Sequence, residues 1–237
     1  MLTRQNFKYF LPRLPNLTQL HTLDLSCNFI DFRLNHDDLN EFCNVLSKLK
    51  YLKNLSLSGS PITNRLERIL NSLGHSLDIL NLDFCSLSEN DLICLNQHQF
   101  LHLDLGTNRL NRFMRQLLIM IMKQTRLVVL DLDYNRFSSN DYLELIACCQ
   151  RLTTLKCLSI RGPNSLTTQL AAATFIGEHY PCLRSWKIAS PIEYSLNRFV
   201  GNDEQNYLIQ TIMPYNMFVD EMNKRAKCLV TIAELSV

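Results

Sequence analysis

One leucine-spaced pattern recurs seven times along the chain and constrains the fold more than any other feature. It reads L-x-x-L-x-L-x-x-N/C-x-L, with serine in place of asparagine or cysteine in one copy and no polar residue there in the last two. Its central residues are Leu23, Leu55, Leu80, Leu103, Leu130, Leu158 and Trp186. A unit of this size cannot bury its apolar residues alone, so neighbouring copies must stack against one another.

Each copy predicts a short strand followed by a helical return. Alternate residues of a strand point to opposite sides, so the L-x-L centre buries its leucines and exposes the residue between them. Leu39, Phe42 and Leu46 then follow at helical spacing. Two helix starts carry the residues of an N-cap: Ser88 with Asp91 and Ser138 with Asp141. The pattern is that of a leucine-rich repeat. We expect an α/β leucine-rich-repeat solenoid (horseshoe), with parallel strands on the concave face and helices on the convex face.

The polar position of the repeat has a structural interpretation. There the chain turns out of the strand, and an asparagine amide can satisfy backbone groups of neighbouring coils. Asn28, Asn108 and Asn135 occupy this position, and Cys85 is a compact replacement. We therefore expect these four side chains to support the fold.

The repeats divide the chain into three parts. Residues 1–19 are expected to form a short N-terminal cap or the truncated edge of a longer array, with Phe7, Tyr9, Phe10 and Leu14 available to cover the first repeat. Residues 20–194 hold the seven repeats. Residues 195–237 are expected to form a helical C-terminal cap, bent at Pro214.

Composition excludes several classes of function. The formal net charge is only +2, too small to favour a nucleic-acid or anionic-membrane partner. Six glycines among 237 residues leave little scope for a phosphate-binding loop, and we expect no cofactor. Nine cysteines without a CxxC motif are typical of reduced thiols, and no N-terminal signal peptide is recognisable. These features predict a cytoplasmic or nuclear protein.

The exposed strand positions form the candidate binding surface. The residue between the second and third leucines, and the one two places later, place aspartates in repeats three to five and basic residues in repeats six and seven. Aromatic and arginine side chains follow where the strands end. Since such side chains anchor protein interfaces, we expect a protein partner on the concave face. The predicted contact residues are Asp83, Phe84, Asp104, Arg109, Asp131, Asp133, Tyr134, Arg136, Arg161 and Lys187.

Catalytic and metal sites find little support in the sequence. Cys85, Cys94, His98 and His102 have metal-binding side chains, but the repeat directs them to different sides of the chain, so we expect no metal site. No glycine-flanked serine, HExxH motif or phosphate loop occurs. We expect a protein that is not an enzyme.

Residues 52–194 resemble the PRAME and PRAME-like leucine-rich-repeat family. The resemblance rests on four stretches: Leu55-Ser56-Leu57-Ser58-Gly59-Ser60, Leu80-Asn81-Leu82-Asp83-Phe84-Cys85-Ser86-Leu87 leading to Asp91-Leu92, Cys149-Gln150-Arg151-Leu152-Thr153-Thr154-Leu155, and Pro191-Ile192-Glu193-Tyr194 after the last strand. Generic leucine-rich repeats share part of this pattern.

The resemblance implies a non-catalytic protein-interaction module. More specifically, it implies a substrate-recognition subunit of a cullin-RING ubiquitin ligase. Elongin and cullin would then bind through an adaptor box that this sequence does not show. Two alternatives remain open: an occluding inhibitor or a regulator of signalling or transcription that binds protein without a ligase, and a GTPase-activating type of solenoid. In the last, Arg109 or Arg136 would act in trans.

Overall fold

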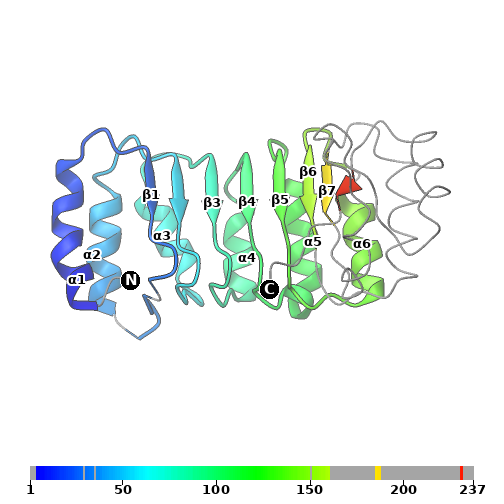
Figure 1. Cartoon of the computed structure of the whole chain (residues 1–237), viewed down its shortest axis with the longest axis horizontal. Coiled ribbons are helices and arrows are strands. Elements are labelled where there is room, and N and C mark those ends of the chain that lie inside the picture. The colour runs from blue at the N-terminus through cyan, green and yellow to red at the C-terminus, as the bar shows by residue number, and fades with distance from the viewer. Residues whose placement is uncertain are drawn as a thin grey trace, which may run out of the picture.

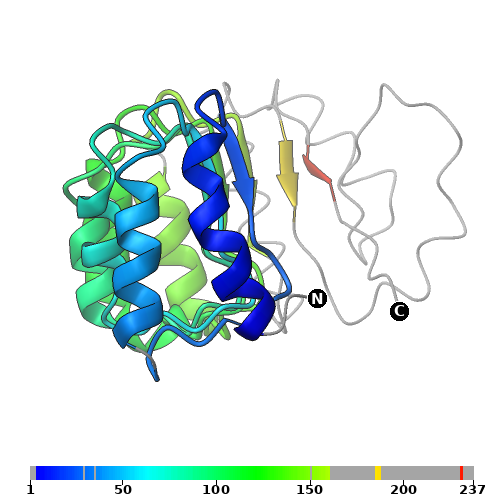
Figure 2. The same ribbon diagram turned by 90° about the vertical axis from the view of Figure 1, so that its left-hand side faces the viewer.

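The fold has two layers, a parallel sheet and a row of helices behind it (Figures 1 and 2). The computed structural model describes residues 4–28, 30–34, 36–149, 151–160, 185–187 and 230–231. Neighbouring strands lie about 4.8 Å apart, whereas a helix is about 10 Å across. Because the helices need more room per repeat than the strands, the stack favours curvature towards the sheet, which supports the predicted concave position of the strands.

The strands pair in sequence order in a single parallel sheet. They are β1 (Thr22–Asp24), β2 (Asn54–Ser56), β3 (Ile79–Asn81), β4 (His102–Asp104), β5 (Val129–Asp131), β6 (Cys157–Ser159), β7 (Ser185–Lys187) and β8 (Val230–Thr231). In the pairs from β1 to β7, the seven predicted central residues lie side by side, from Leu23 against Leu55 to Leu158 against Trp186. The predicted register is confirmed.

The helices return the chain from the end of one strand to the start of the next. They are α2 (His36–Leu46), α3 (Leu66–Ser72), α4 (Glu89–Leu95), the 3-10 turn η2 (Leu110–Phe113) with α5 (Met114–Lys123), and α6 (Ser139–Cys149). The Ser88–Asp91 pair forms a reciprocal capping box at the start of α4, and Ser138 and Asp141 make the corresponding hydrogen bonds before α6. None of the helices that the structure describes is long and apolar enough to cross a bilayer.

Repeated leucines fill the space between the two layers. Leu103 and Leu105 of the fourth repeat are fully buried, as are Leu130 and Leu132 of the fifth. The intervening residue points to the opposite face, as the alternation of a strand requires. The core therefore runs continuously through the described repeats.

Residues 4–16 cover the open end of the first repeat with a helix, α1 (Arg4–Phe10), and a 3-10 turn, η1 (Leu11–Asn16). Phe7 is fully buried, and its ring contacts those of Phe32 and Phe42 at centroid distances of 6.0 and 6.1 Å. Leu14 is buried and Phe10 packs partly against the core, as expected. Tyr9 was expected to join them, but it is 70% exposed because it lies on the outer side of α1.

Buried asparagines join consecutive repeats where the chain leaves each strand. The Asn108 amide donates to the carbonyl oxygens of Leu82, Leu105 and Gly106 at 2.8–3.0 Å. Its oxygen accepts from the backbone N–H groups of Cys85 (3.0 Å) and Leu87 (3.3 Å). One side chain thus satisfies backbone groups of two repeats.

Related hydrogen bonds occur at the same position in repeats one, three and five. Asn135 bonds the backbone of repeats four and five, and Asn28 donates to Leu25 and Ser26. Cys85 donates its thiol to the Leu57 carbonyl oxygen at 3.1 Å. The structural interpretation of these four residues is confirmed.

Two predicted features lie outside the described residues. They are the helical return expected after the sixth strand, near residues 167–179, and the helical C-terminal cap expected over residues 195–237, of which the structure describes only β8. Both stay predictions.

Replacing Asn108 by alanine would remove five hydrogen bonds to the backbone and leave the N–H groups of Cys85 and Leu87 and the carbonyl oxygen of Leu82 without this partner, whereas the carbonyl oxygens of Leu105 and Gly106 keep bonds from Asn135 and Phe84. We expect Asn108→Ala to lower the free energy of unfolding by about 3–5 kcal/mol, because buried polar groups without hydrogen bonds are costly. Urea denaturation followed by circular dichroism measures this. Asn44, exposed on α2, is the matched control, and Asn44→Ala should change stability by less than about 0.5 kcal/mol. A loss below about 1 kcal/mol for Asn108→Ala would contradict the structural role.

Candidate protein-binding surface

The outward-facing strand residues form a polar surface, here called the sheet face. One column of it contains the exposed Asp24 and the half-buried Ser56, Asn81, Asp104 and Asp131. Four of them accept a hydrogen bond from the backbone N–H two residues later. The donors to Asp24, Asn81, Asp104 and Asp131 are Ser26 (2.8 Å), Asp83 (2.9 Å), Gly106 (3.0 Å) and Asp133 (2.9 Å). Since Asn81 makes this bond without a charge, the hydrogen bond explains a polar residue here but does not require a carboxylate.

Two aspartates of the sheet face meet around Gly106. A Cβ atom at residue 106 would lie 2.8 Å from Asp83 Oδ1 and 3.3 Å from Asp104 Oδ1. Ser58 donates to the other oxygen of Asp83 at 3.3 Å. The absence of a side chain at Gly106 therefore lets carboxylates of repeats three and four approach each other, as the predicted acidic cluster requires.

Asp133 departs from its predicted role. It was expected on the exposed surface, but it is only 4% exposed. The hydroxyl of Ser159, itself buried, donates to Asp133 Oδ1 at 2.7 Å. This buried hydrogen bond joins repeats five and six. We therefore assign Asp133 a structural role.

Where the strands end, five consecutive repeats hold the same backbone position in the left-handed region. The residues are Cys27, Gly59, Phe84, Thr107 and Tyr134, with φ between 54° and 79°. Their conformation is fixed across repeats: the N–H groups of Phe84 and Thr107, for instance, donate to the carbonyl oxygens of Gly106 and Asp133. Glycine adopts this conformation without strain, whereas other residues pay about 1 kcal/mol or more.

A second left-handed residue follows after the buried polar position. Ser86, Arg109 and Arg136 have φ of 55°, 58° and 62°. We call the six residues of these two positions in repeats three to five the exit edge: Phe84, Ser86, Thr107, Arg109, Tyr134 and Arg136. Phe84 is 54% exposed and Tyr134 is 40% exposed, although aromatic side chains are usually buried.

A cavity of about 360 Å³, here called the Arg109 pocket, opens along the exit edge between repeats three and four. Its walls include Phe84, Leu87 and Phe113, and its basic groups are Arg109 and Arg112. Of the predicted contact residues, it brings together Phe84 and Arg109. Arg112 and Phe113 belong to η2 and were not predicted, because the sheet-face pattern does not extend into the returning segment.

The pocket coincides with a local departure from the repeat. Repeats three and five place Ser88 with Asp91 and Ser138 with Asp141 at the start of their helices, whereas repeat four has Asn111 and Met114 at these positions. No side chain caps η2 or α5, and neither has an acidic residue in its first turn. Repeats one and two also lack the serine–aspartate pair, with Leu34 and Leu66 at the aspartate position, so this difference alone does not identify the pocket from the sequence.

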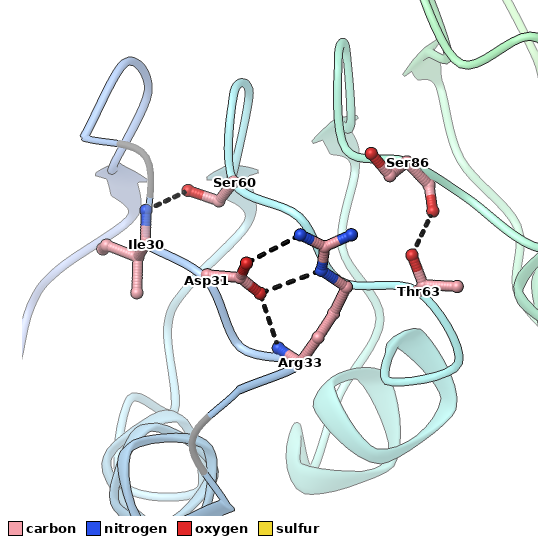
Figure 3. A network of polar contacts seen from close by, with 6 residues as sticks. All are labelled: Ile30, Asp31, Arg33, Ser60, Thr63 and Ser86. Atoms are coloured by element: carbon pink, nitrogen blue, oxygen red, sulfur yellow. Dashed lines mark hydrogen bonds and ion pairs between the residues drawn. The ribbon is translucent and has the colours of Figure 1, made fainter.

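The arginines of the pocket differ from Arg33, which lies after the first strand. Arg33 makes two side-chain hydrogen bonds to Asp31, at 2.7 and 2.9 Å, and this pairing lowers the pKa of the Asp31 carboxyl (Figure 3). In the described part of the chain, neither Arg109 nor Arg112 has a carboxylate within 4.0 Å. Both arginines are exposed, and no carboxylate among the described residues pairs with either of them.

The other predicted contact residues are only partly placed. Tyr134 and Arg136 occupy the exit edge one repeat beyond the pocket. Arg161 lies outside the described residues, and for Lys187 the structure describes the strand but not the side chain.

The sulfur and imidazole groups considered for a metal site are dispersed. Burial raises the pKa of both Cys85 and Cys94 to about 12, so these thiols are protonated near neutral pH. Within the described ranges, no three His, Cys, Asp or Glu side chains are grouped so as to hold a metal ion.

Comparison with known proteins supports the repeat architecture. No family model matches the chain. It is similar to leucine-rich repeat-containing protein 14 of Xenopus laevis, with 33% identity over 112 residues. The chain has the architecture of leucine-rich-repeat proteins. The similarity covers 44% of this chain and 22% of the Xenopus protein, so the chain spans about a fifth of the relative that it matches. It does not distinguish the PRAME family from other leucine-rich-repeat proteins.

Two half-buried histidines should make the stability of the protein depend on pH. Burial lowers the pKa of His98 and His102. The buried Nε2 of His98 has no hydrogen-bond partner among the described residues, so protonation of this atom would form no hydrogen bond with them to offset burial of the charge. Because the unfolded chain takes up these protons more readily, their contribution to stability is full above the unfolded pKa of about 6.5 and falls as the pH decreases towards the folded pKa.

We therefore expect the melting temperature to fall between about pH 7.5 and 5.5. The double variant His98→Gln/His102→Gln should show a smaller fall, because it lacks both titrating groups. Differential scanning fluorimetry across this range measures the difference. Carboxylates with lowered pKa, such as Asp24 and Asp31, respond at lower pH. An equal fall in wild type and variant would contradict the assignment to these histidines.

Proposed function

We propose that the protein is a non-catalytic interaction module that binds a protein partner across the sheet face and the exit edge. The observation that carries this proposal is the retention of exposed aromatic residues at strained exit positions, where the second repeat has Gly59. Strain of this kind persists at functional sites, where the side chain is needed. The leucine-rich-repeat architecture supports the proposal, since solenoids commonly bind partners on their extended inner surface.

The charges arrange this surface in two parts. Asp83 and Asp104 make the sheet face acidic around Gly106, while Arg109 and Arg112 make the adjoining edge basic. Complementary charges on a partner would orient it and select against partners with the wrong pattern. The surface thus suits a partner that presents both a basic and an acidic segment.

At a finer level, we propose the PRAME-like role of a substrate-recognition subunit in a cullin-RING ubiquitin ligase, in the cytoplasm or nucleus. The residues of repeats two, three and five that resemble that family support this role. Affinity purification of the natural full-length product tests it: elongin and cullin should co-purify. Their absence from a preparation that retains other partners would instead favour regulation by binding alone.

The sheet-face charges can be tested without disturbing the backbone. Asp104→Asn/Asp131→Asn should keep the hydrogen bonds to Gly106 and Asp133, as Asn81 does in the third repeat, while removing two charges. We expect the melting temperature to change by no more than about 2 °C, equivalent to about 0.5 kcal/mol, and the bound partners to be reduced. Quantitative mass spectrometry after affinity purification measures the partners.

The matched control removes the same charge from the helix layer. Glu89 and Glu144 are exposed on α4 and α6, so Glu89→Gln/Glu144→Gln should leave both stability and the partner set unchanged. An unchanged partner set for the sheet-face variant would contradict binding through these aspartates.

A further inference from the structure

The Arg109 pocket combines features that select a particular kind of partner. Phe84 and Phe113 supply aromatic walls, and Leu87 adds apolar surface. Arg109 and Arg112 supply two guanidinium groups at the same cavity. A ligand that fills it must therefore present a negative group directly beside an apolar one.

Among the described residues, no carboxylate pairs with Arg109 or Arg112, which favours a negatively charged ligand. In repeat three, Asp91 at the helix start accepts hydrogen bonds from the backbone of Asn64 (2.9 Å) and Leu66 (3.1 Å), joining two repeats. The corresponding residue in repeat four is Met114, which carries no charge and cannot accept such hydrogen bonds through a carboxylate. Repeats one and two have leucine at this position, Leu34 and Leu66, so the assignment rests on the cavity and its two arginines.

We propose that the Arg109 pocket binds an acidic side chain of a partner peptide, an aspartate or glutamate flanked by an aliphatic or aromatic residue. The carboxylate pairs with the guanidinium groups of Arg109 and Arg112, and the flanking side chain packs against Phe84 and Phe113. Arginine suits this task because its planar group binds a carboxylate through two parallel hydrogen bonds. The inference rests on the proposed protein-binding function and specifies the chemistry of the partner at one end of the surface.

Selection from a random peptide-display library tests the proposal directly. The purified wild-type chain should enrich peptides that carry Asp or Glu beside an aliphatic or aromatic residue. The double variant Arg109→Gln/Arg112→Gln should bind the enriched peptides about 10-fold or more weakly, as expected for lost hydrogen bonds to charged groups. Arg68 and Arg151 are exposed away from the pocket, so Arg68→Gln/Arg151→Gln controls for net charge and should bind normally.

Several outcomes would overturn the proposal: no enrichment, enriched peptides without acidic residues, or equal binding by the Arg109→Gln/Arg112→Gln variant. Displacement of the peptides by inorganic phosphate at millimolar concentration would also overturn it, because it would indicate a general anion site. If cellular partners are lost with Asp104→Asn/Asp131→Asn but kept with Arg109→Gln/Arg112→Gln, the proposed function stands and this inference fails.

Discussion

The hydrogen bonds of the buried asparagines at the ends of the strands are the interaction on which the rest of the structure depends. Asn108 and Asn135 each bond backbone groups of two repeats, so they fix both the turn out of the strand and the spacing between coils. Cys85 joins its repeat to the preceding one through a single hydrogen bond from its thiol to the Leu57 carbonyl oxygen. Because these side chains hold the backbone from the inside, the residues on either side of them point outward, and the exit edge follows from the same bonds.

This arrangement separates the demands of folding from those of binding. The turn needs left-handed residues beside the buried polar position, and Gly59 shows that glycine meets this need. Phe84 and Tyr134 occupy equivalent positions with strained backbones and with much of their side chains in solvent. A partner can therefore reach the exposed part of both side chains. The same holds for Arg109, whose charge finds no carboxylate among the residues that the structure describes.

The repeat pattern predicted the sheet register because each leucine has one allowed place in the stack, and Leu23 to Trp186 pair accordingly. Burial of individual polar residues was less predictable. Asp133 shares its repeat position with Asp83, but it is buried and accepts a hydrogen bond from Ser159. Strand alternation does not predict this bond, because it joins residues 26 positions apart. The Arg109 pocket was half predicted: its exit-edge residues follow the repeat, whereas Arg112 and Phe113 come from a 3-10 turn that, among repeats one to five, only the fourth contains.

The unfolding free energy of the double variant Phe84→Gly/Tyr134→Gly tests most directly whether the exit edge serves binding rather than folding. Glycine relieves about 1 kcal/mol of backbone strain at each site and costs a similar amount in the entropy of the unfolded chain. Chemical denaturation should therefore give a stability within about 1 kcal/mol of wild type. A loss of about 3 kcal/mol or more, as expected for core aromatic residues, would contradict the separation of roles.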